Sequence, residues 1–297
     1  MTTGVLLMTY GAPRDDADLP GYLARVRGGR APDDALVAEM RRRYARIGGS
    51  PLIRITEAQA AALEAELGAG YRARAGMRYS EPTIADRATE LAGADAVVGI
   101  VMSPQWSPTL MRGYADALRA AVPRPTHVAG AWHLEPAFVG ALAAAVRGAW
   151  SRLGRPHVLF TAHSLPKRVF EAEPEYVAQL RATGAAIANA AGLRSDEWTW
   201  AYQSAGHTQE EWLRPDLVDL FPEIAASGAR DIVVAPVQFL ADHLEVLYDL
   251  DIAAAEQARA AGLVYRRIAM PNTQPAFIAA LAAVTRATES ALVGVAR

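Results

Sequence analysis

Cysteine is absent from the 297 residues of this chain, and lysine occurs once, as Lys167, in a set of thirty basic residues that is otherwise arginine. Without cysteine the protein has no disulfide, thiolate zinc site, cysteine nucleophile or cysteine-ligated iron–sulfur cluster. The arginine bias, together with abundant alanine, is typical of a skewed base composition in the gene. A formal net charge of −2 gives no general attraction to nucleic acid.

Long apolar stretches are also missing from the sequence. No run approaches the roughly 20 residues that a membrane-spanning helix needs, so no integral membrane association is expected. The first residues, MTTGVLLMTYGAP, lack the basic segment and the longer apolar run of a secretory signal peptide. We therefore expect a soluble cytoplasmic protein whose length lets it fold on its own hydrophobic core.

Strand-like and helix-like segments alternate along the chain. Short β-rich runs predict strands at Val5–Tyr10, Arg72–Tyr79, Ala96–Ser103, Thr126–Trp132, His157–Ala162, Trp198–Gln203, Asp231–Val237 and Leu263–Ala269. Alanine-rich segments with helical periodicity predict helices at Asp34–Ile47, Glu57–Leu67, Pro108–Ala121, Pro136–Leu153, Tyr176–Ala191, Asp242–Ala261 and about Gln274–Leu292. Such alternation favours parallel sheets covered by helices. Eight strands suit one barrel or two four-stranded sheets.

An internal repeat favours two sheets. VLLMTYGAP (Val5–Pro13) resembles VLFTAHSLP (Val158–Pro166), and VGIVMSPQWSPTLMRGYADAL (Val98–Leu118) resembles IVVAPVQFLADHLEVLYDLDI (Ile232–Ile252). Each pair lies about half the chain apart. We predict an α/β protein of two similar Rossmann-like domains, residues 1–140 and 141–297, with the active site in the cleft between them. The last helix could pack back on the first domain.

Candidate functional residues follow the predicted strands, because open α/β sheets bind ligands beyond the carboxyl ends of their strands. His163 ends one strand, and Asp242, Glu245 and Asp249 follow another at spacings that share one helix face. Histidine and carboxylates can bind a divalent cation or accept protons. The structural alternatives are a histidine without a functional role, a solvated acidic face, and Asp242 as N-cap with Glu245 at N3.

Four motifs together resemble the ferrochelatase family, and most of all its soluble bacterial coproporphyrin III branch: RRRYARIGGSPL, TAHSLP, YQSAGHTQEEWLRPDL and PVQFLADHLEVLYDLD. The likeness extends from VLLMTYGAP to MPNTQPAFIAAL. The resemblance implies two similar Rossmann-like domains around a cleft and an enzyme, a lyase, that inserts Fe²⁺ into a porphyrin during haem biosynthesis. Fe²⁺ is then a substrate, and the resemblance implies no permanently bound cofactor.

The resemblance also implies residue roles. His163 and Glu245 would be catalytic and would face each other on one side of the macrocycle. The metal-binding residues would be His163, Glu245 and Asp249, with Asp242 as a further candidate in the outer row. The porphyrin would be bound by Tyr10, Arg27, Arg43, Tyr44, Ser50 and Tyr114, of which Tyr10 can contact the iron of the product.

Three positions depart from the family pattern. Tyr79 stands where some relatives carry histidine, Gln238 stands where glycine is usual before the phenylalanine, and Ala253 stands where the outer row has another acid. These differences bear on the outer metal path and not on the core reaction.

The substrate is expected to be coproporphyrin III, because Tyr10 matches that branch and Gly21–Arg30 (GYLARVRGGR) is arginine-rich where a membrane-fed enzyme would carry hydrophobic lips. The product could pass to a haem-processing decarboxylase. The alternatives are a protoporphyrin IX ferrochelatase, a chelatase that inserts cobalt or nickel into another tetrapyrrole, a non-enzymatic haem or porphyrin carrier that would not need Glu245, and a two-lobed solute-binding protein.

Overall fold

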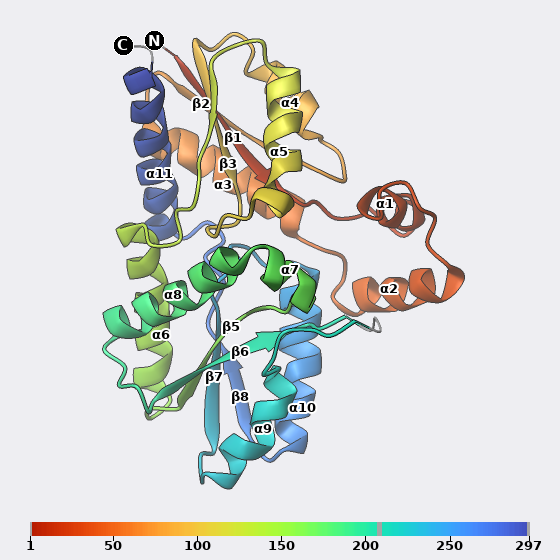
Figure 1. Cartoon of the computed structure of the whole chain (residues 1–297), viewed down its shortest axis with the longest axis vertical. Helices are drawn as coiled ribbons and strands as arrows, with labels where there is room; N and C mark the ends of the chain where they lie inside the picture. Colours follow the sequence, from red (N-terminus) through yellow and green to blue (C-terminus); the bar gives the residue numbers. More distant parts are fainter. Residues whose placement is uncertain (1, 207–209, 296–297) are drawn as a thin grey trace.

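Two parallel four-stranded sheets form the framework of the protein (Figure 1), in a computed structural model that describes residues 2–206 and 210–295. The strand orders are β2-β1-β3-β4 and β6-β5-β7-β8. The strands are β1 (Thr3–Thr9), β2 (Tyr71–Met77), β3 (Ala96–Val101), β4 (Thr126–Val128), β5 (His157–His163), β6 (Trp198–Gln203), β7 (Asp231–Pro236) and β8 (Val264–Arg267). The prediction of two sheets is confirmed, and the sheet-edge strands β4 and β8 are shorter than the sequence indicated.

Helices connect the strands and cover the sheets. They are α1 (Leu19–Val26), α2 (Asp34–Arg46), α3 (Leu52–Leu67), α4 (Ile84–Glu90), α5 (Pro108–Ala121), α6 (Pro136–Arg152), α7 (Lys167–Ala172), α8 (Pro174–Ala191), α9 (Leu217–Ala226), α10 (Ala255–Ala260) and α11 (Pro275–Val295), together with the π-helix η1 (Glu245–Ala254). None of the helices described has the length and apolar character of a transmembrane segment.

The predicted helix at Asp242–Ala261 needs a correction. Its first half is the π-helix η1, whose N-cap is Leu244, so Asp242 is not the N-cap. Instead the Asp242 carboxylate accepts a hydrogen bond from Asn272 Nδ2 at 2.8 Å and pairs with Arg267 at 3.4 Å. Arg267 is the last residue of β8 and Asn272 follows that strand. Together they hold Asp242 in the segment before η1 begins.

In each sheet the first strand of that half in sequence is an inner strand, and the strand order reverses around it. β1 lies between β2 and β3, and β5 lies between β6 and β7. All seven residues of β1 are buried, because this strand is covered on both faces. The point where the strand order reverses is the usual ligand crevice of an open α/β sheet. Tyr10 directly follows β1 and His163 ends β5, so these two residues mark equivalent positions.

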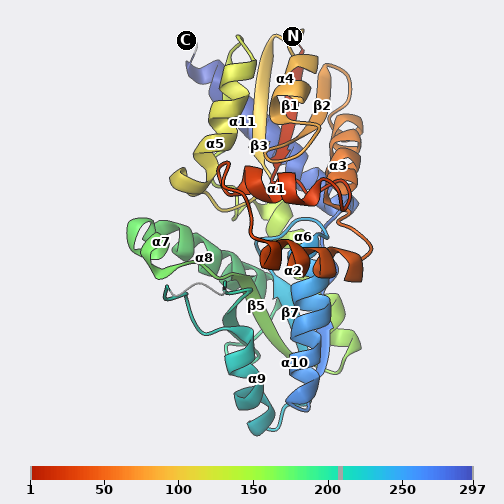
Figure 2. The same ribbon diagram turned by 90° about the vertical axis from the view of Figure 1, so that its right-hand side faces the viewer.

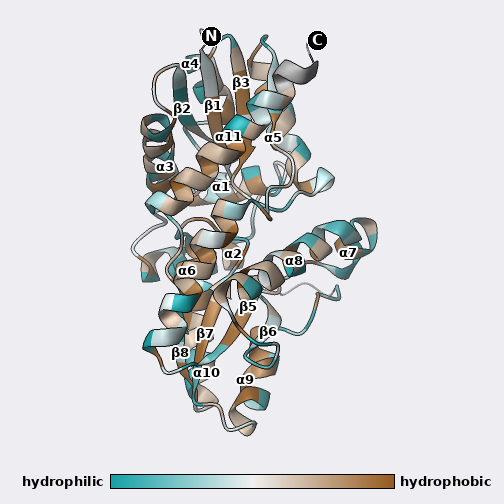
Figure 3. Ribbon diagram, turned by 90° about the vertical axis from the view of Figure 1, so that its left-hand side faces the viewer, coloured by the Kyte–Doolittle hydropathy of each residue, from teal (hydrophilic) through white to brown (hydrophobic). Residues whose placement is uncertain are grey.

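Helices α6 and α11 join the two halves. α11 packs against α3, β3 and β4 of the first half and against α6, which in turn packs against α8 and β7 of the second half. The largest group of buried apolar side chains is continuous through these helices and includes Leu7, Phe160 and Phe277. Figure 3 shows β3 and β7 in brown, as hydrophobic, whereas the helices have mixed colours. The division at residue 140 falls inside α6 and stays a prediction.

Helices α1 and α2 project from the first half and reach the second (Figures 1 and 2). Leu19, Tyr22 and Leu23 of α1 form a small apolar cluster of their own with side chains of α2. α2 contacts η1, and Arg46 pairs with Glu256 of α10 at 3.4 Å. The α1–α2 segment is therefore one wall of the space between the halves.

Glu173 links the halves at the start of α5. Its carboxylate accepts hydrogen bonds from the Ser107 hydroxyl and, at 2.9 Å, from the Thr109 backbone N–H. Ser107 is the N-cap of α5, so a residue from the second half satisfies a helix end in the first. Burial acts to raise the pKa of Glu173, but these hydrogen bonds outweigh it and lower the pKa below its ordinary value.

We predict that Glu173→Ala lowers the free energy of unfolding by about 1–3 kcal/mol at pH 7, since hydrogen bonds to a charged group are lost. The folded pKa is depressed, so this stabilisation is present above about pH 4.3, the ordinary value for Glu, and is lost as the pH falls through the folded pKa. Urea unfolding at a series of pH values measures both effects. The exposed neighbour Glu171→Ala is the control, and an equal deficit at every pH would contradict the prediction.

Candidate functional site

A cavity of about 700 Å³ lies between the two halves and is called the first cavity here. Aromatic and apolar side chains from α1, α2, α5, α8 and the segments after β1, β2, β5 and β7 make up most of its wall. They include Tyr10, Tyr22, Tyr44, Tyr79, Leu110, Tyr114, Leu165, Tyr176 and Phe239. Glu245 is the only carboxylate among the described residues of this wall. The first cavity therefore suits a large, mostly apolar molecule.

A second cavity of about 870 Å³ adjoins the first and has the opposite character. Its described wall carries six carboxylates and two guanidinium groups: Glu210, Glu211, Asp216, Asp219, Glu245 and Asp249, with Arg43 and Arg214. Met40, His163, Leu244 and Glu245 line both cavities. A small cation could therefore approach the first cavity through the second and meet His163 and Glu245 at the shared wall.

His163 is held at the end of β5 in a defined orientation. Its backbone N–H donates to Gln238 Oε1 at 3.0 Å, and its ring Nδ1 lies 2.5 Å from the carbonyl oxygen of Ser164. A carbonyl only accepts hydrogen bonds, so Nδ1 carries the proton. In the neutral ring the lone pair then belongs to Nε2, which lies 4.0 Å from Glu245 Oε2. Nε2 is thus the atom that can accept a proton or bind a metal.

Glu245 faces a second imidazole as well. His243 Nε2 lies 3.7 Å from the same Oε2 atom, while His243 Nδ1 is 3.0 Å from the Ala241 carbonyl oxygen. Burial by itself would raise the pKa of Glu245, but the positive charge of His163 and the hydrogen bond and charge of His243 outweigh it and lower the pKa to about 2. A carboxylate that faces two imidazole nitrogens is a place where a proton or a cation is stabilised.

Asp249 continues from Glu245 along η1 and lines the second cavity. Each N–H of a π-helix bonds to the carbonyl five residues back, so the turn is wide, and such turns are frequent at functional sites. Asp249 Oδ1 lies 3.5 Å from Arg43 Nη1. Burial raises the pKa of Asp249 above its ordinary value. Asp242 lines neither cavity and is held by Arg267 and Asn272, so it does not continue this row.

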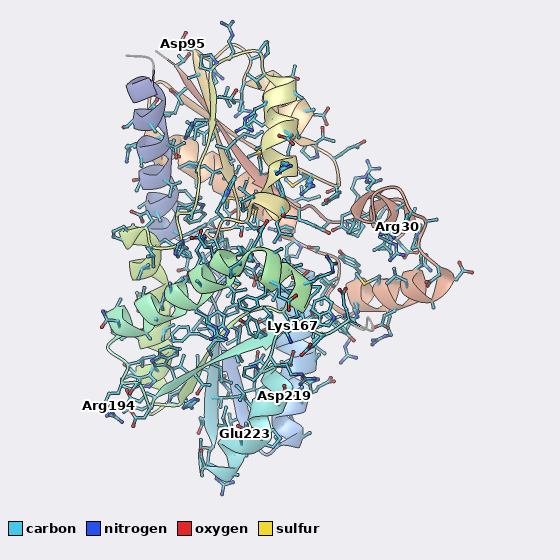
Figure 4. The ribbon with its side chains drawn as sticks, in the orientation of Figure 1. Arg30, Asp95, Lys167, Arg194, Asp219 and Glu223 are labelled. Carbon is cyan, nitrogen blue, oxygen red and sulfur yellow. The ribbon has the colours of Figure 1, made fainter. Side chains whose placement is uncertain are left out.

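The residues expected to bind porphyrin fall into three groups. Tyr10, Tyr44, Ser50 and Tyr114 line the first cavity. Arg43 lines the second cavity, where it pairs with Glu39 at 2.7 Å besides Asp249. Arg27 is exposed at the end of α1 and lines neither cavity. Arg30, on the loop that follows, is also exposed and also lines neither cavity (Figure 4).

Tyr10 occupies the position in the first sequence repeat that His163 occupies in the second. The turn that follows Tyr10 holds it in place. Its ring meets that of Tyr79 edge-on, with 4.7 Å between the centroids. Gly11 adopts a φ of 97°, and a Cβ there would lie 2.1 Å from Ser80 Oγ, so only glycine fits the turn. Desolvation inside the cavity, then the neighbouring Tyr79, raises the pKa of Tyr10. The Tyr10 hydroxyl is therefore protonated at neutral pH.

No three His, Asp or Glu side chains of the described residues are arranged to hold a metal ion together. Of the three residues expected to bind metal, His163 and Glu245 face each other, while Asp249 lies one π-turn further and is paired with Arg43. The geometry brings a pair together and leaves the third group as a separate step in the second cavity. This arrangement suits a passing cation better than a resident one.

Several cavity residues were missed in the sequence. His243 lies within the quoted D-H-L-E motif, and the histidine beside Glu245 could have been singled out on chemical type alone. Arg78, in the wall of the first cavity, had no signal beyond its place near the end of the predicted strand Arg72–Tyr79. Glu210, Glu211 and Asp216 lie in a motif that was quoted only as a likeness, and Asp219 follows that motif. Glu211 pairs with Lys167 of α7 at 3.1 Å, and Lys167 and Asp219 of α9 are labelled in Figure 4.

Two of the departing positions have structural partners. Gln238 bonds the His163 backbone through Oε1 and donates from Nε2 to the Tyr176 hydroxyl at 2.8 Å, so it ties the ends of β5 and β7 to α8. Tyr79 packs on Tyr10. Ala253 lines the second cavity without a polar group. His207, Thr208 and Gln209 of the quoted motif YQSAGHTQEEWLRPDL lie outside the described residues.

Known proteins are similar to this chain in sequence or in fold. A coproporphyrin III ferrochelatase from Geobacillus kaustophilus is 38% identical, over 95% of this chain and 95% of that protein. A ferrochelatase from Deinococcus radiodurans is 37% identical, over 95% of this chain and 94% of that protein.

Among solved structures, SirB from Bacillus subtilis with Fe³⁺ has a TM-score of 0.59 at 12% identity, covering 99% of this chain and 98% of that one. CbiX, described as the terminal enzyme for biosynthesis of sirohaem in denitrifying bacteria, has a TM-score of 0.57 at 18% identity, covering 96% of this chain and 98% of that one. At these identities the two structures show a shared fold alone.

A family model described as ferrochelatase matches residues 2–289. This match covers almost the whole chain, including both sheets, both cavities and the residues of their shared wall. The chain therefore belongs to the ferrochelatase family.

Proposed function

We propose that this protein inserts Fe²⁺ into a porphyrin, and that the porphyrin is coproporphyrin III. The observation that carries the proposal is the pair of adjoining cavities, one aromatic and one acidic, whose shared wall holds His163 and Glu245. A porphyrin and a divalent cation need separate surroundings of these two kinds. The names of relatives at 37–38% identity, ferrochelatase and coproporphyrin III ferrochelatase, support the same reaction.

The macrocycle would occupy the first cavity. Metalation must remove two pyrrole N–H protons and deliver the cation to the ring nitrogens. The neutral His163 ring offers its Nε2 lone pair toward Glu245, and this nitrogen can accept a proton from the porphyrin. Glu245, ionised because its pKa is about 2, can stabilise the imidazolium or hold the incoming cation. His163 and Glu245 are therefore proposed as the catalytic pair.

Fe²⁺ would arrive through the second cavity. Its carboxylates exceed its guanidinium groups, and oxygen and imidazole ligands without thiolate suit a cation that must leave again. Asp249 would bind the cation before Glu245 does. To do so it must release Arg43, which can keep Glu39 as its partner at 2.7 Å. Arg43 would then be free to meet a carboxylate of the porphyrin.

Tyr10, Arg27, Arg43, Tyr44, Ser50 and Tyr114 are proposed to bind the porphyrin, with Tyr10 on the face opposite His163. Burial raises the pKa of Tyr44 and of Tyr114, so both hydroxyls stay protonated and can donate hydrogen bonds to carboxylates. Arg27 lies exposed on the α1–α2 segment and would meet a carboxylate that protrudes from the cavity. Among the described residues no carboxylate forms an ion pair with Arg27 that would compete.

Coproporphyrin III is preferred over protoporphyrin IX in this proposal. It carries four carboxylates, whereas protoporphyrin carries two carboxylates and two apolar vinyl groups. The arginines of the α1–α2 segment favour the more acidic ring, because charge-assisted pairs are roughly twice as strong as neutral hydrogen bonds. A cytoplasmic location and delivery of the product to a decarboxylase fit such a water-soluble substrate and complete the proposal.

The first prediction concerns the reaction itself. Purified protein with Fe²⁺ and coproporphyrin III under anaerobic conditions should convert the free-base Soret and Q bands to those of the metalated ring, with many turnovers per protein. A porphyrin carrier would bind the ring without turnover. A cobalt or nickel chelatase would turn over those metals with a different tetrapyrrole. Stoichiometric binding with no metalation would rule out the proposed function.

The second prediction concerns the catalytic pair. His163→Ala and Glu245→Gln should each lower kcat by about 10²–10⁴, because a positioned proton acceptor or its charge partner is lost. Porphyrin affinity, measured by fluorescence quenching without iron, should remain. His157→Gln is the matched control, since His157 bonds Thr199 at 2.8 Å and lines neither cavity. A His163→Ala variant with near-normal kcat would refute the assignment.

The third prediction concerns substrate choice. The specificity constant kcat/KM should be higher for coproporphyrin III than for protoporphyrin IX in the same detergent-free buffer. Arg43→Ala and Arg27→Ala should reduce the preference by about tenfold each, the effect of one lost charge-assisted bond. Arg42→Ala is the control, because Arg42 shares Glu39 with Arg43 but lines neither cavity. Equal constants for the two porphyrins in the wild type would disprove the choice of coproporphyrin.

A further inference from the structure

Arg78 is the only arginine or lysine among the described residues that line the first cavity. It follows β2, on the same side of the cavity as Tyr10 and Tyr79. Neither Arg27 nor Arg43, the arginines expected to bind porphyrin, is part of this wall. The permanent positive charge inside the first cavity therefore comes from a residue to which the sequence analysis gave no role.

The guanidinium of Arg78 has few partners. One N–H donates to the Leu110 carbonyl oxygen at 3.1 Å, and the Tyr114 hydroxyl is a second partner. Within the described part of the chain no Asp or Glu forms an ion pair with it. A guanidinium has five N–H donors, so donors are left over. A half-buried cation without a counter-ion is costly, and an anionic ligand in the cavity would remove that cost.

Packing fixes the position of the Arg78 guanidinium before any ligand arrives. Its central carbon lies 5.0 Å from the centroid of the Tyr79 ring and 4.9 Å from that of Tyr114. Gly113 lies beside it, and a Cβ there would be 2.2 Å from Arg78 Nη2. The glycine thus leaves the space that the guanidinium fills. Such a pre-positioned side chain loses little further freedom when it binds.

We propose that Arg78 binds a carboxylate of the porphyrin together with the Tyr114 hydroxyl, inside the first cavity. This inference rests on the proposed function and adds to it a specificity-determining residue. The planar guanidinium can offer two parallel N–H groups to one carboxylate. A tetrapyrrole with a carboxylate at this corner is selected over one with an apolar substituent there, because only the carboxylate neutralises Arg78.

Binding of coproporphyrin III without iron tests the proposal, measured by fluorescence quenching of the full chain. Arg78→Gln should weaken binding by about 10- to 100-fold, and Arg78→Lys, which keeps the charge but not the two-pronged shape, should fall between. Arg119→Gln is the matched control: it removes one charge from α5, where Arg119 is 59% exposed and lines neither cavity. Its affinity should equal that of the wild type.

The neutral tetramethyl ester of coproporphyrin III separates charge from shape. Wild type and Arg78→Gln should bind the ester equally, because the ester has no anion for Arg78 to pair with. Unchanged affinity of Arg78→Gln for the free acid would overturn the proposal, as would an equal loss for acid and ester, which indicates a damaged cavity. If Arg78→Gln does not fold, Arg78→Lys and the ester still give the comparison. Absence of iron insertion by wild type would contradict the proposed function and not this inference.

Discussion

The contact of the Glu245 carboxylate with the imidazole rings of His163 and His243 is the interaction on which the site depends. Two imidazole Nε2 atoms face one oxygen of this carboxylate, at 4.0 Å and 3.7 Å. Each imidazole is oriented by a backbone carbonyl that accepts a hydrogen bond from its Nδ1–H, so the Nε2 atoms of both rings face the carboxylate. A proton or a cation placed among these three groups is stabilised by the carboxylate charge. In the proposed reaction the protons come from the porphyrin and the cation from the acidic cavity.

The duplicated fold explains why that pair lies at a wall between two cavities. Tyr10 and His163 occupy matching places in the two repeats, each at the end of a central strand where the strand order reverses. Each sheet therefore contributes one of these two residues to the wall of the first cavity. The continuous apolar core through α6 and α11, and the contact of Glu173 with the start of α5, fix how the halves face each other.

The second cavity depends on η1. A π-helix after β7 directs Glu245 and Asp249 to the same cavity, and the acids of segment 210–219 form the facing wall. Ala253 of η1 lines this cavity without a polar group, and carboxylates from the segment 210–219 surround the cavity as well. Arg43 lines the second cavity and pairs with Asp249, and in the proposed function it also meets a carboxylate of the porphyrin. An exchange of that partner would couple porphyrin binding to cation binding.

Local pattern determined the elements of the fold. Period and composition are properties of neighbouring residues, so the eight strands and the longer helices could be located from the sequence, and the repeated segments indicated two sheets. The placement of His163 after a central strand also followed from pattern, because strand ends are where open sheets bind ligands. The family could be identified because four motifs occur together, although none of them is specific alone.

Tertiary structure decided what each charged side chain pairs with. The spacing of Asp242, Glu245 and Asp249 suggested one row, yet Asp242 is held by Arg267 and Asn272, which lie more than twenty residues away in sequence. The π-helix has no periodicity signal that differs from that of an α-helix in so short a segment. Arg78, His243 and the acids of segment 210–219 became cavity residues only through packing, because ion pairs and cavity walls join residues that no local pattern connects.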